Sequence, residues 1–245
     1  ASYIGERGFL GGSLSRYENR YGVPGHSHEH EDHDHEGDGG DDHEEEHGDV
    51  VIDMKQTRAD VKAGLSQPFA GHEALRVRIA RNDYRHVELE GEEIGTRFDN
   101  TGTEARIELV HAPVAGWTGA YGTQVGQRDF KAIGEEAFVP PSESRDLGLF
   151  LIERREWERA SLEVGGRYDR VKVDPASEQS SVSTSAFSAS LAGEWRFSDH
   201  WHLRLGLDRA QRAPGVEELY SDGLHVATGG YELGDPGLGK ETANQ

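Results

Sequence analysis

Residues 26–49 concentrate the side chains of this chain that could bind metal ions. The stretch holds seven of the thirteen histidines and twelve of the forty-six acidic residues, with no lysine or arginine. Neutral imidazole is a ligand for Zn²⁺, Cu²⁺ and Ni²⁺, and carboxylates add oxygen ligands that neutralise cation charge. The composition therefore predicts metal binding. The candidate ligands are His26, His28, His30, His33, His35, His43, His47, Asp32 and Asp34.

The spacing of these histidines suits convergence on one ion. His26, His28 and His30 occupy every second position, as do His33 and His35, so in an extended chain each set projects to one side. The stretch has no large apolar side chain that could form a hydrophobic core, and its many negative charges repel one another. We therefore expect a loop that becomes ordered only when cations bind. The absence of cysteine disfavours a closed structural zinc site and favours exchangeable capture. The alternative is a solvated acidic loop, for which the histidine content is too high.

The charge of the whole chain limits its partners. The formal net charge is −20, and residues 26–49 carry twelve of the negative charges. A phosphate backbone requires a basic face, so nucleic acid is not expected as a partner, whereas cations are. No Gly-x-Ser-x-Gly, HExxH or phosphate-loop pattern occurs, so the chain is not predicted to be an enzyme.

Outside this stretch, apolar and polar residues alternate as in β-strands. Leu75, Val77 and Ile79, for example, alternate with Arg76 and Arg78. We expect about nine strands of roughly ten or more residues. They are placed at residues 8–21, 50–65, 74–90, 103–111 and 117–130, and around Leu149, Val164, Leu191 and Leu205. A shift of apolar phase within 50–65 predicts a β-bulge, and residues 211–240 are expected to form a long Gly-rich loop.

The predicted connections alternate between short turns on one rim and long polar loops on the other. This arrangement is typical of outer-membrane barrels. Such barrels have a hydrophilic average composition, because every second residue of a strand faces the lumen rather than the lipid. A soluble β-sandwich is the alternative, but its strands are shorter, near 5–6 residues. The fold class predicted is all-β: an antiparallel transmembrane β-barrel in contact with outer-membrane lipid. Residues 26–49 are then an extracellular loop insertion.

Three segments resemble known receptors. Residues 212–220 (RAPGVEELY), 223–228 (GLHVAT) and 231–241 (YELGDPGLGKE) resemble a mid-barrel segment of TonB-dependent outer-membrane receptors. Residues 21–28 (YGVPGHSH) and 75–86 (LRVRIARNDYRH) resemble the zinc-uptake (ZnuD-like) branch. The resemblance implies a barrel of about 22 strands around an N-terminal plug, energised by the TonB complex. Neither the plug nor the last strands are recognisable, so we expect residues 1–245 to be an internal piece of the barrel, with 9–10 of its strands.

The resemblance implies a zinc receptor in the outer membrane of a Gram-negative bacterium. Residues 26–49 would capture Zn²⁺ above a tighter site at the barrel mouth. Candidates for that site are His225, from its place in the resembling motif, and His86 with Glu88 near the end of a strand. Two alternatives remain open: a receptor for haem or a ferric siderophore, with histidine binding haem iron, and a loop that only buffers metal or contacts host proteins. His72 and His111 flank short turns, and no chemistry is expected of them.

Overall fold

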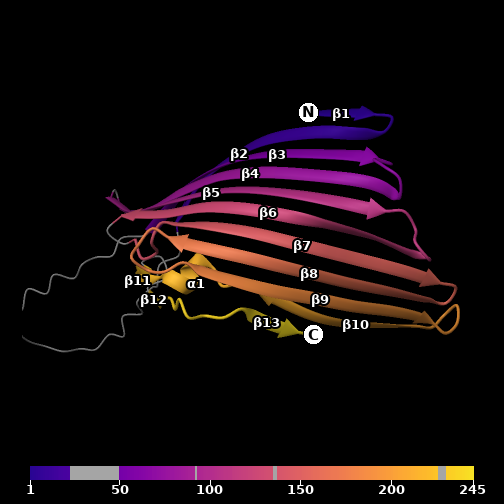
Figure 1. Ribbon diagram of the computed structural model, residues 1–245. Coiled ribbons are helices and arrows are strands. Elements are labelled where there is room, and N and C mark those ends of the chain that lie inside the picture. The colour runs from indigo at the N-terminus through magenta and orange to yellow at the C-terminus, as the bar shows by residue number, and fades with distance from the viewer. Residues whose placement is uncertain (23–49, 92, 135–136, 226–229) are drawn as a thin grey trace, which may run out of the picture.

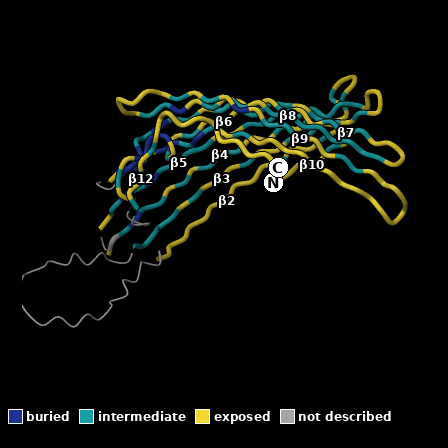
Figure 2. The backbone as a smooth tube through the Cα atoms, turned by 90° about the horizontal axis from the view of Figure 1, so that it is seen from below, coloured by how far each residue is buried: buried dark blue, intermediate teal, exposed yellow. Residues whose placement is uncertain are grey.

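The computed structural model describes residues 1–22, 50–91, 93–134, 137–225 and 230–245. Most of this chain forms one antiparallel sheet of eleven strands, in the order β1 to β10 followed by β13. Consecutive strands lie side by side (Figure 1), and the sheet is strongly arched across its width (Figure 2). The strands are β1 (Ser2–Gly5), β2 (Gly8–Gly22), β3 (Val50–Ser66), β4 (His72–Glu90), β5 (Glu93–His111), β6 (Trp117–Gly134), β7 (Ser142–Trp157), β8 (Ala160–Pro175), β9 (Val182–Arg196), β10 (His202–Arg212) and β13 (Glu241–Asn244).

The predicted rims are present with one exception, because β4 and β5 are joined by only two residues on the side of the long loops. Connections on one rim, named here the short-turn rim, comprise residues 6–7, 67–71, 112–116, 158–159 and 197–201. Those on the opposite rim, the long-loop rim, comprise residues 23–49, 91–92, 135–141, 176–181 and 213–240. Strand β5 begins at Glu93, ten residues earlier than predicted, because its first half is polar and lacks the alternation used to find strands. β4 and β5, with 19 residues each, exceed the 9–11 residues needed to cross a bilayer.

One face of the sheet is apolar across many strands. Val61, Ile79, Ala105, Val125 and Leu147 form a row of direct cross-strand partners from β3 to β7. The four larger side chains are between 42% and 46% exposed. Such a continuous exposed apolar surface is stable only against lipid, so this is the outer face of the barrel wall. The predicted transmembrane β-barrel wall is therefore present.

The opposite, inner face is polar at the same level. Lys62, Arg78, Arg106 and Gln124 form the neighbouring row on that face. Toward the long-loop rim the outer face also becomes charged, with ion pairs such as Arg81–Asp83 and Arg97–Asp99. The strands thus continue beyond the lipid-facing band on that side.

The bulge predicted within residues 50–65 is wrong. β3 pairs with β2 and β4 from Val50 to Leu65 without a shift of register. The apolar residues change from one face of β3 to the other because this regular strand leaves the lipid-facing band part-way along its length. Ala59, Val61 and Leu65 face lipid, whereas Ile52 and Met54 face inward above the lipid-facing band. The register shifts lie instead between β4 and β5, at His72/Ala74 and Glu88/Leu89.

The segment expected to be a Gly-rich loop folds instead. It contains helix α1 (Val216–Tyr220) and the hairpin of β11 (Asp222–His225) and β12 (Gly230–Leu233), which together are named here the mouth insert. Val216, Leu219 and Tyr220 are at most 2% exposed. They pack in one cluster with inward-facing residues of the barrel wall, Phe98, Phe130, Ala132 and Val173, and with Phe138 and Val139. No helix in the described ranges is long and apolar enough to span a membrane.

Candidate functional site

The nine candidate ligands between His26 and His47 lie outside the described residues. Their flanking strands are described: Gly22 ends β2, Val50 begins β3, and Gly22 and Val51 are register partners. The histidine-rich stretch therefore connects two adjacent strands at the long-loop rim. This is the rim at which the mouth insert lies.

His86 and Glu88 lie on the inner face of β4 close to this rim. His86 Nε2 is 3.8 Å from Glu88 Oε1, and the imidazole stacks on Phe98 at 4.4 Å between ring centroids. Tyr84 packs edge-on against the same imidazole at 5.5 Å. Two aromatic contacts thus fix the plane of the His86 ring, and β4 aligns the carboxylate beside it.

Glu88 is buried, His86 is partly buried, and the hydrogen-bonding capacity around them is not used up. Glu88 is 6% exposed, and Thr96, its register partner on β5, is 1% exposed. His86 Nδ1 and Thr96 Oγ1 are buried and have no hydrogen-bond partner within the described residues. A buried polar group without a partner costs about 1–3 kcal/mol. The site therefore has polar capacity that a bound cation, or a ligand carrying one, would satisfy.

His225 is placed by the mouth insert. Its Nδ1 lies 2.7 Å from Glu232 Oε1 across the β11–β12 hairpin, and its ring packs on Phe138 at 4.8 Å. A carboxylate held against one imidazole nitrogen is the arrangement that orients metal-binding histidines. The hairpin and the 135–141 connection thus fix the position of His225 at the mouth.

The two His/Glu pairs do not merge into one centre. No group of three or more His, Asp or Glu residues close enough to hold a metal ion occurs among the residues that the structure describes. Each pair would therefore need additional ligands to complete a coordination shell. His86, Glu88 and His225 stay predicted ligands, and nothing in the local sequence pattern pointed to the aromatic supports Phe98 and Phe138.

Polar contacts anchor the mouth insert to the barrel wall. Arg212, at the end of β10, donates two hydrogen bonds of 2.7 Å to the Glu218 carboxylate, which also accepts the Gly215 N–H at 2.7 Å. These contacts, with the guanidinium contributing most, lower the pKa of Glu218 to about 2. Arg128 on β6 donates to Glu217 at 3.2 Å, and the Tyr220 hydroxyl donates to the Ser180 carbonyl at 2.9 Å. The RAPGVEELY motif therefore has a structural role in docking α1.

The same motif lies within a match that covers nearly the whole chain. Residues 2–245 match the family model described as TonB dependent receptor-like, beta-barrel. The chain belongs to this family. Its members are receptors and transporters of the Gram-negative outer membrane, which is where this protein resides.

Among solved structures, the chain is similar to one named copper transporter OprC. The two share 14% sequence identity with a TM-score of 0.58, and the match covers 71% of this chain and 35% of OprC. At this identity the similarity shows the fold alone. The chain spans about a third of the length of that transporter. The resemblance to TonB-dependent receptors is confirmed, whereas membership of the zinc-uptake branch stays a prediction.

Proposed function

We propose that this chain forms part of the barrel of a TonB-dependent receptor that imports zinc. In this proposal residues 26–49 capture Zn²⁺ at the cell surface and raise its concentration above the mouth. The His86–Glu88 pair and His225 each contribute ligands to tighter binding at the barrel mouth, as two separate positions. The TonB complex, acting through a plug, supplies the energy for release into the periplasm.

The observation that carries the proposal is the pairing of a metal-binding composition with buried ligands on the same rim. Residues 26–49 offer many weak, exchangeable ligands. Near the same rim, Glu88 is 6% exposed beside His86, whose Nδ1 has no partner within the described residues. A transport path needs this gradient, because the first ligands must release the ion and later ones must hold it more tightly.

Copper and haem are the competing substrates. Imidazole and carboxylate ligands also suit Cu²⁺, so the metal must be identified by competition. Haem carries carboxylates, and the acidic excess of residues 26–49 disfavours its approach. A loop that only buffers metal or contacts host proteins would leave uptake through the barrel unchanged when it is removed.

Calorimetric titration of Zn²⁺ into the full-length receptor at neutral pH tests the capture step. The comparison is a variant lacking residues 25–48, with Ni²⁺, Cu²⁺ and haem as competitors. We expect several zinc equivalents that disappear with the deletion, and slower cellular zinc uptake at low supply. Uptake that is unchanged at every zinc concentration would remove the proposed role of the loop.

Substitutions at the mouth test the tighter site separately. His86→Gln and His225→Gln should each weaken zinc binding at their own position by about tenfold or more, since a lost or misoriented ligand has an effect of this size. His200→Gln, in the exposed turn at the opposite rim, removes a histidine without touching the mouth. Equal affinities in all three variants would exclude the mouth residues as ligands while leaving capture by residues 26–49 untouched.

A further inference from the structure

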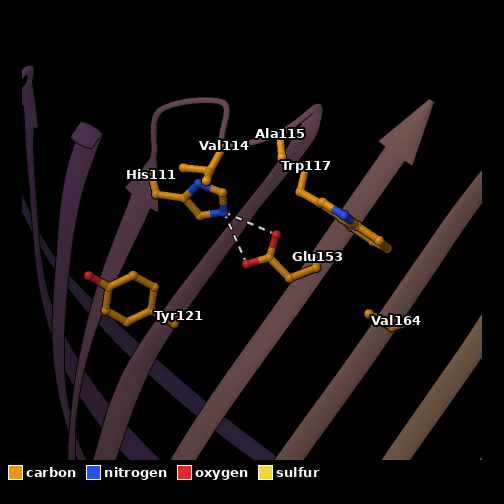
Figure 3. A pocket seen from close by; sticks show the side chains of 7 residues that line it. All are labelled: His111, Val114, Ala115, Trp117, Tyr121, Glu153 and Val164. Atoms are coloured by element: carbon orange, nitrogen blue, oxygen red, sulfur yellow. Dashed lines mark hydrogen bonds and ion pairs between the residues drawn. The ribbon is translucent and has the colours of Figure 1, made fainter. Parts of the chain in front are cut away.

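A pocket lies on the outer face of the barrel wall at the short-turn rim. It encloses about 520 Å³ and is lined by His111, Val114, Ala115, Trp117, Tyr121, Glu153 and Val164. Figure 3 shows the His111 and Glu153 side chains meeting beside the 112–116 turn, with Trp117 and Tyr121 on either side. No chemistry was expected of His111 from its place in the sequence.

The pocket continues the lipid-facing band. Leu65, Leu75, Leu109, Tyr121 and Leu151 form a row of cross-strand partners on the outer face. Glu153 is two residues beyond Leu151 on the same face of β7, and Val164 of β8 is its register partner. The pocket therefore has lipid-facing side chains as its floor and lies where that band meets the short turns. In outer-membrane barrels short turns face the periplasm, and aromatic residues mark the level of the headgroups.

The contacts of His111 favour its protonated, positively charged form. Its Nε2 is 3.0 Å and 3.1 Å from the two Glu153 carboxylate oxygens, and its Nδ1 is 2.7 Å from the Ala112 carbonyl oxygen. Both partners can only accept hydrogen bonds, so both ring nitrogens donate, as in imidazolium. Tyr121 is held in turn by His72, whose Nε2 lies 2.7 Å from the tyrosine hydroxyl.

Arg155 is not one of the lining residues, but it lies beside the pocket at the 112–116 turn. It is the register partner of Trp117, and a Cβ on Gly116 would lie 3.5 Å from its Nε. Within the described residues its guanidinium lies over the Trp157 ring, 5.0 Å from the centroid, and forms no ion pair with a carboxylate. Glu153 is paired with His111, so the charge of Arg155 is left without a carboxylate partner within the described residues. Glu73 on β4 is also near His111, but it is exposed and can turn toward water.

We propose that this pocket binds a glycerophospholipid of the periplasmic leaflet by its phosphodiester headgroup. Arg155 donates hydrogen bonds to the phosphate oxygens. The His111 imidazolium pairs with Glu153 and neutralises this carboxylate, which would otherwise repel the phosphate. Tyr121 and Val164 contact the first segment of an acyl chain. A single phosphodiester carries one negative charge, which can pair with the Arg155 guanidinium. The proposal is independent of the transported metal.

Native mass spectrometry of the full-length receptor in detergent tests this site. The probes are phosphatidylglycerol, phosphatidylethanolamine, diacylglycerol, which lacks the phosphate, and inorganic phosphate. We expect one tightly bound phospholipid whose affinity falls about tenfold in Arg155→Gln, because a charge-assisted hydrogen bond is lost. Arg159→Gln, an exposed arginine in the neighbouring 158–159 turn, is the matched control and should bind lipid as the wild type does.

Three outcomes would overturn the proposal. Equal lipid affinity in Arg155→Gln and Arg159→Gln would show that charge at this pocket is irrelevant. Binding of diacylglycerol as tight as that of the phospholipids would show a purely apolar groove. Displacement of the lipid by millimolar inorganic phosphate would assign the site to free phosphate. Both variants alter partly or fully exposed side chains, and unchanged heat-dependent gel mobility of the barrel confirms that each one folds.

Discussion

Gly234→Ala should loosen the mouth insert, because this glycine touches the backbone at the end of α1. A Cβ at Gly234 would lie 2.6 Å from the Tyr220 nitrogen and 2.7 Å from the Leu219 carbonyl carbon. Real Cβ atoms essentially never approach closer than 3.0 Å, and backbone atoms cannot rotate away. The hydrogen bonds from Gly234 N–H to the Ser221 carbonyl and from Asp235 N–H to the Glu218 carbonyl, 2.7 Å and 3.0 Å, must therefore lengthen.

The cost should be about 1–3 kcal/mol, the usual range for overpacking. Since each 1.4 kcal/mol is a factor of ten, the amide protection of Leu219, Ser221 and Asp222 should fall about 5- to 150-fold. Hydrogen exchange followed by mass spectrometry on the full-length receptor measures this directly. Gly239→Ala is the matched control, because a Cβ there meets nothing within 4 Å. Equal protection in the two variants would refute the close packing of Gly234 against α1.

Three further predictions test other parts of the structure. Leu219→Ala, at a side chain 1% exposed, should destabilise the mouth insert by about 2–5 kcal/mol in the same exchange assay, whereas Leu238→Ala, 43% exposed, should change it little. The contacts that lower the pKa of Glu218 stabilise the mouth insert fully when the pH is above 4.5, the ordinary pKa of a glutamate. This stabilisation is lost as the pH falls through about 2. Protection should thus decrease across this interval, and Glu218→Gln should abolish that dependence; an identical profile in the variant would contradict it. Leu205→Arg on the lipid face should cost about 2–4 kcal/mol in denaturant unfolding from lipid vesicles. Ala192→Arg, on the inner face beside Gly206, should cost much less, and equal losses would mean that the two faces are wrongly assigned.

Strand alternation was enough to predict the barrel wall, because it is a local signal. Residues two positions apart share a face, so Leu75, Val77 and Ile79 marked the lipid side without knowledge of their neighbours. The same reasoning failed at β5, where the first half extends beyond the lipid and is polar. It also mistook a change of environment in β3 for a bulge, since a pattern of side chains does not reveal where the membrane ends.

Composition alone led to the predictions that residues 26–49 bind cations and that nucleic acid is not a partner, since charge and ligand type do not depend on the fold. Only the tertiary structure placed Phe98 against His86, docked α1 in the mouth and joined His111 to Glu153. These contacts link residues far apart in the chain, as in the Arg128–Glu217 pair, which are 89 positions apart. Their formation depends on the register of several strands together, which no local period encodes.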